Sequence, residues 1–234
     1  MEKATQTSGL FCLIDAIFKT NVHQIKIVCN CLLILDQVLK VYIKTSFQPD
    51  ETRYVFGSWF ALHYIENQGM AFGTTFGSGM LPKLALSIFR IVAIVFIAIY
   101  FTRELKNEAS LFFLVAIGFV WAGATGNLID SMFYDFIFPF NPCDGFNQVE
   151  GSGVKRICSD YGFSYPVQVR NQGFLLGNVV DMFQFDVAYP SWVPYLSGKQ
   201  VFPAIWNLAD ASITTGVGLI IIRQRTIFSK KKEA

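Results

Sequence analysis

The sequence is poor in the residues that bind metals. It has two histidines among 234 residues, and it contains neither an HExxH motif nor a pair of cysteines spaced as CxxC. Zinc sites in proteins are built mainly from His and Cys side chains at such spacings. We therefore expect no metal site and no cofactor.

Charged residues are also scarce. They make up 15% of the chain, the formal net charge is +2, and the basic residues form no stripe interleaved with aromatic side chains. Proteins that bind nucleic acid depend on such a concentration of positive charge. The composition therefore argues against a nucleic-acid partner.

Apolar residues, in contrast, are abundant and gathered in long blocks. The chain is 53% hydrophobic with a mean hydropathy of +0.41, and it contains 24 phenylalanines. A helix of about 20 apolar residues crosses a bilayer core of about 30 Å. We predict a membrane α-helical fold in one domain, residues 1–234, with transmembrane helices at about 25–43, 84–101, 111–129 and 203–222.

The segments outside these blocks have other compositions. Residues 1–23 carry the short patch LFCLIDAIF and no cleavage site, which indicates a cytoplasmic or interfacial N-terminus rather than a cleaved signal peptide. Residues 46–81 are polar and glycine-rich, and the alternation in VFGSWFALHYIEN predicts short strands. Residues 131–201 form a long loop whose aromatic clusters indicate contact with the bilayer surface.

The basic tail RQRTIFSKKK places the C-terminus in the cytoplasm by the positive-inside rule. With four spans, the N-terminus is then cytoplasmic as well, and residues 46–81 and 131–201 lie outside. Cys143 and Cys158 fall in the outer loop, where an oxidising compartment would allow a disulfide. Their spacing alone leaves a bridged pair and a free pair equally open.

Asp36 and Lys40 lie within the first predicted span and, four residues apart, share a face of the helix. A charge inside a membrane helix is costly enough to count as a functional candidate. Two interpretations stay open: a self-neutralising ion pair with Lys40 reaching towards the interface, or a site in which Asp36 orients other groups. The predicted topology brings further acids and amides to the same outer surface. They are Asn67, Asn127, Asp130, Asp181, Asn207 and Asp210.

Two acids of this set, Asp181 in GNVVDMFQFD and Asp210 in WNLADASITTG, indicate a chemistry. Two carboxylates held close together cannot both ionise easily, so one keeps a proton while the other can take one from water. This is the arrangement of the aspartic proteases, in which the pair activates water against a peptide carbonyl. Asn178 and Asn207 lie beside the acids and could donate hydrogen bonds to them or to a substrate.

Other functions fit the sequence less well. A proton-coupled membrane transporter would use intramembrane acids, but these acids gather at one end of the helices and none lies near mid-depth. A membrane scaffold would leave the clustered acids and amides unexplained. Lys83 and Ser87 have the spacing of a serine–lysine pair, but nothing around them resembles an oxyanion hole, and we interpret Lys83 as an interfacial anchor.

Five motifs follow one another along the chain: LDQVLK, NQGMAF, GATGNLID, NVVDMF and WNLADASITTG. In this order they resemble lipoprotein signal peptidase, also called signal peptidase II, a bacterial membrane aspartic peptidase. The resemblance implies that Asp181 and Asp210 are the catalytic pair. The residues that it implies for substrate binding and support of the site are Asp36, Lys40, Asn67, Gly69, Asn127, Asp130, Asn178 and Asn207.

The same resemblance implies the fold, the substrate and the location. The family has four transmembrane helices with a small extracytoplasmic β-cradle, here residues 46–81, and needs no metal. Its substrates are prolipoproteins whose cysteine carries a diacylglyceryl group, and the cut falls just before that cysteine. We therefore expect a multi-pass, monomeric enzyme of the bacterial cell inner membrane, in contact with membrane lipids, with its active site near the extracytoplasmic face and globomycin as an inhibitor.

The chain departs from the family pattern at two places. Ser131 follows Asp130 where most members have an arginine. About fifty residues separate Asp130 from Asp181 where the usual connection is a few residues, and this insert, residues 131–177, contains both cysteines of the outer loop. As a hypothesis, the insert packs over the cradle or rests on the outer leaflet.

Overall fold

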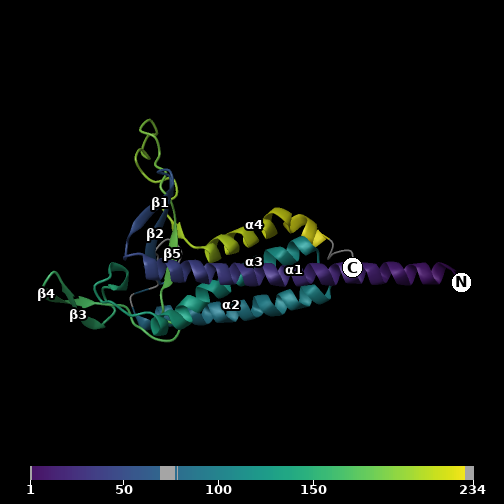
Figure 1. Ribbon diagram of the computed structural model, residues 1–234, viewed down its shortest axis with the longest axis horizontal. Coiled ribbons are helices and arrows are strands. Elements are labelled where there is room, and N and C mark those ends of the chain that lie inside the picture. The colour runs from purple at the N-terminus through teal and green to yellow at the C-terminus, as the bar shows by residue number, and fades with distance from the viewer. Residues whose placement is uncertain (1, 69–76, 78, 230–234) are drawn as a thin grey trace. The chain divides into compact units, whose positions relative to one another are not determined.

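The computed structural model describes residues 2–68, 77 and 79–229 (Figure 1). In this part of the chain, short strands lie between α1 and α2 and between α3 and α4, while α2 is followed directly by α3. The elements in order are α1 (Glu2–Ser46), β1 (Thr52–Phe56), β2 (Phe60–Asn67), α2 (Met80–Lys106), α3 (Leu111–Ile137), the 3-10 helix η2 (Gly145–Asn147), β3 (Lys155–Asp160), β4 (Phe163–Gln168), β5 (Val179–Phe185), β6 (Ile205–Trp206) and α4 (Leu208–Ser229).

Helices α2 and α3 have the length and composition of membrane-crossing helices. Each has 27 residues, and their most apolar stretches have mean hydropathies of 2.5 and 1.8. They contain the blocks at 84–101 and 111–129, so the helices predicted there are confirmed. Among the described residues, these two helices are long enough and apolar enough to cross a membrane. The apolar part of α4, Leu208–Ile222, is shorter.

The first and last helices differ from their predicted bounds. α1 runs for 45 residues through both the segment 1–23 and the span predicted at 25–43, so the N-terminal segment continues the helix and is not a separate element. α4 begins at Leu208, not at residue 203 as predicted. The reason is that Ile205 and Trp206 pair with β5, which engages backbone groups that a helix would need.

The chain divides into two compact units. The helical unit comprises residues 1–35, 93–125 and 209–234, and the sheet unit comprises residues 36–92 and 126–208. Helices α1, α2 and α3 each contribute residues to both units. All four strands of the larger sheet belong to the sheet unit. This unit also holds most of the predicted site residues.

Close contact between helices holds the helical unit together. A β-carbon on Gly123 would lie 2.3 Å from the carbonyl oxygen of Ala209, and one on Gly216 would lie 2.5 Å from that of Ala116. Small residues allow helices to approach in this way within a membrane. The buried apolar side chains of this unit are Ile25, Cys29, Leu114 and Ala122.

The sheet unit contains a four-stranded antiparallel sheet in the order β1-β2-β5-β6, of which Figure 1 labels β1, β2 and β5. Its register pairs Ile65 with Asp181 and Phe183 with Trp206. The short strands predicted within 46–81 are confirmed, but the loop predicted at 131–201 is wrong for β3, β4 and β5. β5 pairs with a strand that lies far earlier in the chain, and local sequence patterns do not report such a partner.

This sheet packs against the ends of α1 and α3 that belong to the same unit. Val180 and Met182, which flank Asp181 on β5, are fully buried in the contact. Successive side chains of a strand point to opposite faces, so Asp181 projects from the face opposite to these two. The buried residues of the cluster are Ile43, Phe47, Tyr64, Tyr134, Val180 and Met182.

The insert forms a hairpin, β3–β4, whose first strand is joined by a disulfide to the segment before η2. Cys143 and Cys158 are bridged, with 5.1 Å between their Cα atoms, which decides the question that their spacing left open. Tyr161 and Gly162 at the turn both have positive φ, of 47° and 81°, as a tight hairpin turn requires. A two-stranded sheet is only marginally stable alone, so the bridge holds this one in place.

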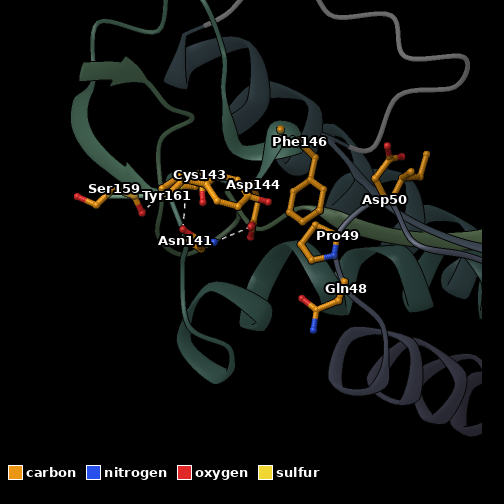
Figure 2. A pocket seen from close by; sticks show the side chains of 12 residues that line it. Gln48, Pro49, Asp50, Asn141, Cys143, Asp144, Phe146, Ser159 and Tyr161 are labelled. Carbon is orange, nitrogen blue, oxygen red and sulfur yellow. Dashed lines mark hydrogen bonds between the residues drawn. The ribbon is translucent and has the colours of Figure 1, made fainter. Parts of the chain in front are cut away.

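A cavity of about 750 Å³ lies between the insert and the residues that precede β1, and both segments line it (Figure 2). Asp144 lies on its wall and accepts a hydrogen bond from Asn141 at 2.7 Å. Burial raises the pKa of the Asp144 carboxyl above its usual range. The cavity contains none of the predicted site residues. Its lining residues are Gln48, Pro49, Asp50, Ile65, Asn141, Cys143, Asp144, Gly145, Phe146, Ser159, Asp160 and Tyr161.

Removal of the bridge should loosen the hairpin. A cross-link that closes a loop of about 15 residues contributes about 3 kcal/mol by restricting the unfolded chain. The Cys143→Ser/Cys158→Ser variant should therefore be cut faster by trypsin after Lys155 and Arg156, as measured by limited proteolysis in detergent. Cys31→Ser, which replaces an exposed free cysteine, is the control. Equal cutting rates in both variants would contradict this role of the bridge.

Candidate active site

A buried lysine lies at the centre of the polar residues of the sheet unit. Lys40, on α1, is fully buried. Its Nζ lies 3.0 Å from Asp36 Oδ2, 2.8 Å from Asp130 Oδ2 and 2.8 Å from Asn127 Oδ1. An ammonium group has three N–H donors, so each of them has one acceptor. The predicted pairing with Asp36 is thus confirmed, while the idea that Lys40 reaches the interface is wrong.

Gln37 and Tyr134 support the same carboxylates, and the sequence reasoning missed both. Gln37 Nε2 donates to Asp130 Oδ1 at 3.0 Å and to Asp36 Oδ2 at 3.2 Å. The Tyr134 hydroxyl donates to Gln37 Oε1 at 3.2 Å. The sequence could have indicated Tyr134, because it follows Asp130 by four residues, or about one helical turn, and therefore shares a helix face with it.

Asp181, on β5, is 2% exposed, and two side-chain amides hold its carboxylate. Asn67 Nδ2, on β2, donates to Oδ2, and Asn207 Nδ2, just before α4, donates to Oδ1 at 2.6 Å. Hydrogen bonds to an ionised carboxylate are stronger than those between neutral groups. Asp181 is therefore fixed by donors on both of its oxygens.

A chain of hydrogen bonds joins Asp181 to Lys40. Besides Asp181, Asn207 Nδ2 lies 3.1 Å from Asn127 Oδ1, the same oxygen that accepts from Lys40. Asn207 and Asn127 are both buried, so these bonds are shielded from water. The sequence motifs far apart in the chain thus meet in one network. The predicted site residues that it brings together are Asp36, Lys40, Asn67, Asn127, Asp130, Asp181 and Asn207.

A second ion pair anchors β2 on α1 beside this network. Lys44 Nζ contacts Glu66 Oε1, which also accepts a hydrogen bond from the Tyr64 hydroxyl at 2.6 Å. Burial, together with the negative charge of Glu66, raises the pKa of Tyr64, so its hydroxyl stays protonated and donates. Because Glu66 immediately precedes Asn67, this pair also fixes the strand that places Asn67 beside Asp181.

The remaining predicted site residues are Asp210, Asn178 and Gly69. Asp210 is partly buried in the first turn of α4 and belongs to the helical unit. Asn178 is 2% exposed, and no hydrogen-bond partner of its amide lies among the described residues. Gly69 lies outside the described residues.

The side chains of this network do not suit a metal ion. Lys40 takes the place between Asp36 and Asp130 that a bound cation would otherwise occupy. In the described part of the chain, no three His, Cys, Asp or Glu side chains are grouped so that they could hold a metal ion.

Comparison with known families identifies the family of this chain. A family model described as signal peptidase (SPase) II matches residues 28–226, which is most of the chain. The chain belongs to the signal peptidase II family. The matched range includes each of the motifs that surround Asp36, Asn67, Asp130, Asp181 and Asp210.

Curated relatives of this signal peptidase II are named lipoprotein signal peptidase. The relative from Porphyromonas gingivalis is 36% identical over 198 residues, which cover 82% of this chain and 78% of that protein. The relative from Amoebophilus asiaticus is 33% identical over 201 residues, which cover 82% of this chain and 74% of that protein. Both matches extend over much more than the short motifs.

A solved structure supports the fold. A bacterial membrane enzyme determined by the in meso method at 2.3 Å resolution matches with a TM-score of 0.53 and 22% sequence identity, over 90% of this chain and 93% of that chain. The signal peptidase II described here is accordingly a membrane α-helical protein with a small β-sheet.

Lys83 and Ser87 have structural partners in this signal peptidase II. Lys83 Nζ donates to the carbonyl oxygen of Gln68 at 2.6 Å, and Ser87 Oγ donates to that of Leu175 at 2.7 Å. Both residues are buried. The expectation that Lys83 is an interfacial anchor is therefore wrong, because its ammonium is turned to a backbone carbonyl within the protein.

Loss of the central ammonium should destabilise the fold. Lys40→Met leaves Asp36 and Asp130 buried without their shared counter-charge, which costs about 3–5 kcal/mol when one partner of a buried ion pair is removed. We expect a clearly lower Tm in detergent, measured by thermal unfolding. Lys26→Met, at an exposed position of the same helix, should leave the Tm unchanged. Equal Tm values for the two variants would show that the ammonium is not needed.

Proposed function

We propose that this membrane aspartic endopeptidase removes the signal peptide from diacylglyceryl-modified prolipoproteins and cuts just before the lipidated cysteine. The observation that carries the proposal is the carboxylate of Asp181, which is buried and held by the amides of Asn67 and Asn207. The relatives named lipoprotein signal peptidase support the substrate class.

In this proposal Asp210 is the partner of Asp181. Asn207 donates directly to Asp181, and Asp210 follows Asn207 by three residues. Three residues of even a fully extended chain span at most about 11 Å, and the turn from Asn207 into α4 shortens that path. The covalent connection therefore favours a pair of carboxylates at one site.

The pair performs hydrolysis by exchanging protons with water and the peptide. The ionised carboxylate takes a proton from water, whose oxygen attacks the carbonyl carbon of the residue before the cysteine. The protonated carboxyl donates to the carbonyl oxygen as charge develops there. When the tetrahedral intermediate collapses, the C–N bond breaks and the cysteine nitrogen receives the proton that the carboxylate took from water. The products are a peptide carboxylate and a lipoprotein with a free amino terminus.

The network around Lys40 supports this chemistry without entering it. Asn207 is bonded both to Asp181 and to Asn127, and Asn127 is bonded to Lys40. Fixed donors that already point at Asp181 need no rearrangement during the reaction. In this proposal Asp36, Lys40, Asn127 and Asp130 position the catalytic carboxylate, while Gly69 and Asn178 belong to the residues that bind the substrate or support the site.

The location of the enzyme follows from the same proposal. The protein spans the bacterial cell inner membrane four times as a monomer surrounded by lipids, with its catalytic pair near the extracytoplasmic face and the sheet acting as a cradle for the substrate. The apolar helices α2 and α3 support the membrane location. The disulfide between Cys143 and Cys158 supports an extracytoplasmic insert, because such bridges persist in oxidising compartments. The comparisons offer no support for a proton-coupled transporter.

Replacement of either acid should abolish cleavage without unfolding the protein. Asp181→Asn and Asp210→Asn keep the side-chain shape but cannot exchange the proton, so we expect turnover to fall by about 10³-fold or more. The measurement is a gel-shift assay with a diacylglyceryl-modified prolipoprotein and its unlipidated form, with globomycin as inhibitor.

The matched control is Asp160→Asn, which changes an exposed acid on β3 and should cleave at the wild-type rate. EDTA should have no effect on the wild-type enzyme. Appreciable turnover by either purified active-site variant would remove that acid from the mechanism, and cleavage of the unlipidated form at the same rate would overturn the substrate class.

A further inference from the structure

Arg170 lies in the segment that leads from the hairpin of the insert to β5, and its guanidinium is buried among protein groups. Nη1 and Nη2 bind the two oxygens of Asp135 at 3.0 and 2.7 Å, and Nε donates to Asn147 Oδ1 at 2.8 Å. Nη1 also donates to the carbonyl oxygen of Leu176 at 3.2 Å. One side chain thus joins α3, η2 and the approach to β5.

Asp135 holds the same approach by a further bond. Its Oδ2 accepts from the backbone N–H of Gly173 at 3.0 Å, in addition to the bonds from Arg170. Both charges are buried, and a two-pronged guanidinium–carboxylate pair fixes orientation as well as distance. The segment between these two anchor points, residues 173–176, is therefore fastened at each end.

The backbone between these anchors adopts a strained path. Leu175 has φ of 68°, in the left-handed region that a residue with a branched side chain rarely enters. Such a conformation persists only where the surroundings enforce it. Here the Leu175 carbonyl accepts from buried Ser87, and the Leu176 N–H donates to the Gly173 carbonyl at 3.0 Å.

The next residues lie directly on α3. The Gly177 N–H donates to the Ser131 carbonyl at 3.0 Å, and a β-carbon at Gly177 would lie 2.5 Å from the Asp130 carbonyl oxygen. The Val180 N–H then donates to Asp130 Oδ2 at 3.3 Å. Asp181 is the following residue, so contacts at residues 173, 175, 176, 177 and 180 connect Arg170 to the strand that carries the carboxylate.

We propose that Arg170 is a positioning residue for peptide cleavage, which sets the path of residues 173–180 and thereby the place of the Asp181 carboxylate. The proposal rests on the proposed function, in which Asp181 is catalytic. It gives the insert a role in the reaction, because the guanidinium that fastens the approach to β5 comes from the insert itself. Arg170 acts through Asp181 and does not bind the substrate.

The test separates a loss of rate from a loss of binding. Arg170→Lys and Arg170→Ala should lower kcat by about 10- to 100-fold, since a displacement of about 1 Å at a reacting group can cost 10² in rate. KM for the lipidated prolipoprotein should stay within about twofold. Arg156→Ala, at an exposed position on β3, is the matched control and should keep the wild-type kcat.

Chemical rescue provides a readout that a general loss of folded protein would not give. Arg170 lines a cavity of about 250 Å³, through which a small cation could reach the vacated place. Added methylguanidinium should therefore restore part of the kcat of Arg170→Ala and leave the kcat of Asp181→Asn unchanged. No recovery of kcat in folded Arg170→Ala would count against the proposal.

A second variant covers the case in which Arg170→Ala does not fold because Asp135 is left unpaired. Asp135→Leu/Arg170→Met removes both charges together, a change that buried ion pairs often tolerate. Its kcat should still fall at least about 10-fold. Wild-type kcat in this variant, or a raised KM with unchanged kcat, would overturn the positioning role alone. Full activity of Asp181→Asn would overturn the proposed catalytic pair and the positioning role with it.

Discussion

The burial of one ammonium group among apolar helices is the constraint on which the sheet unit depends. Lys40 is fully buried, and its charge is tolerable only because Asp36, Asp130 and Asn127 all accept hydrogen bonds from it. Any arrangement that satisfies Lys40 must bring the part of α1 in the sheet unit against that of α3. The polar cluster therefore fixes the helix ends to which the sheet attaches, and the apolar contacts fill the space around it.

The sheet attaches to these helix ends and thereby fixes the position of the Asp181 carboxylate. Val180 and Met182 bury their side chains against α1 and α3, which leaves Asp181 on the opposite face. There the amides of Asn67 and Asn207 meet its two oxygens. Residues that are far apart in the chain thus act on one group, and the rigidity that this gives is what a preorganised active site needs.

The sequence allowed the helices and much of the polar network to be predicted. The four-residue spacing of Asp36 and Lys40 predicted their contact, because residues at that spacing share a helix face. The position of β5 could not be predicted in the same way, since the strand that pairs with it is remote and its own pattern is short. Burial of Lys83 was missed because its carbonyl partner, Gln68, lies in a segment without a regular pattern. The role of Arg170 depends on contacts that only the folded insert creates.

We propose that Asp181 and Asp210 act on one peptide bond. The most direct test is an experimental structure of the Asp210→Asn variant with an uncleaved diacylglyceryl lipopeptide. We predict that the carbonyl group before the lipidated cysteine lies between the side chains of residues 181 and 210, within reach of both directly or through one water molecule. A lipopeptide bound with that carbonyl beside only one of the two, or beside neither, would contradict it.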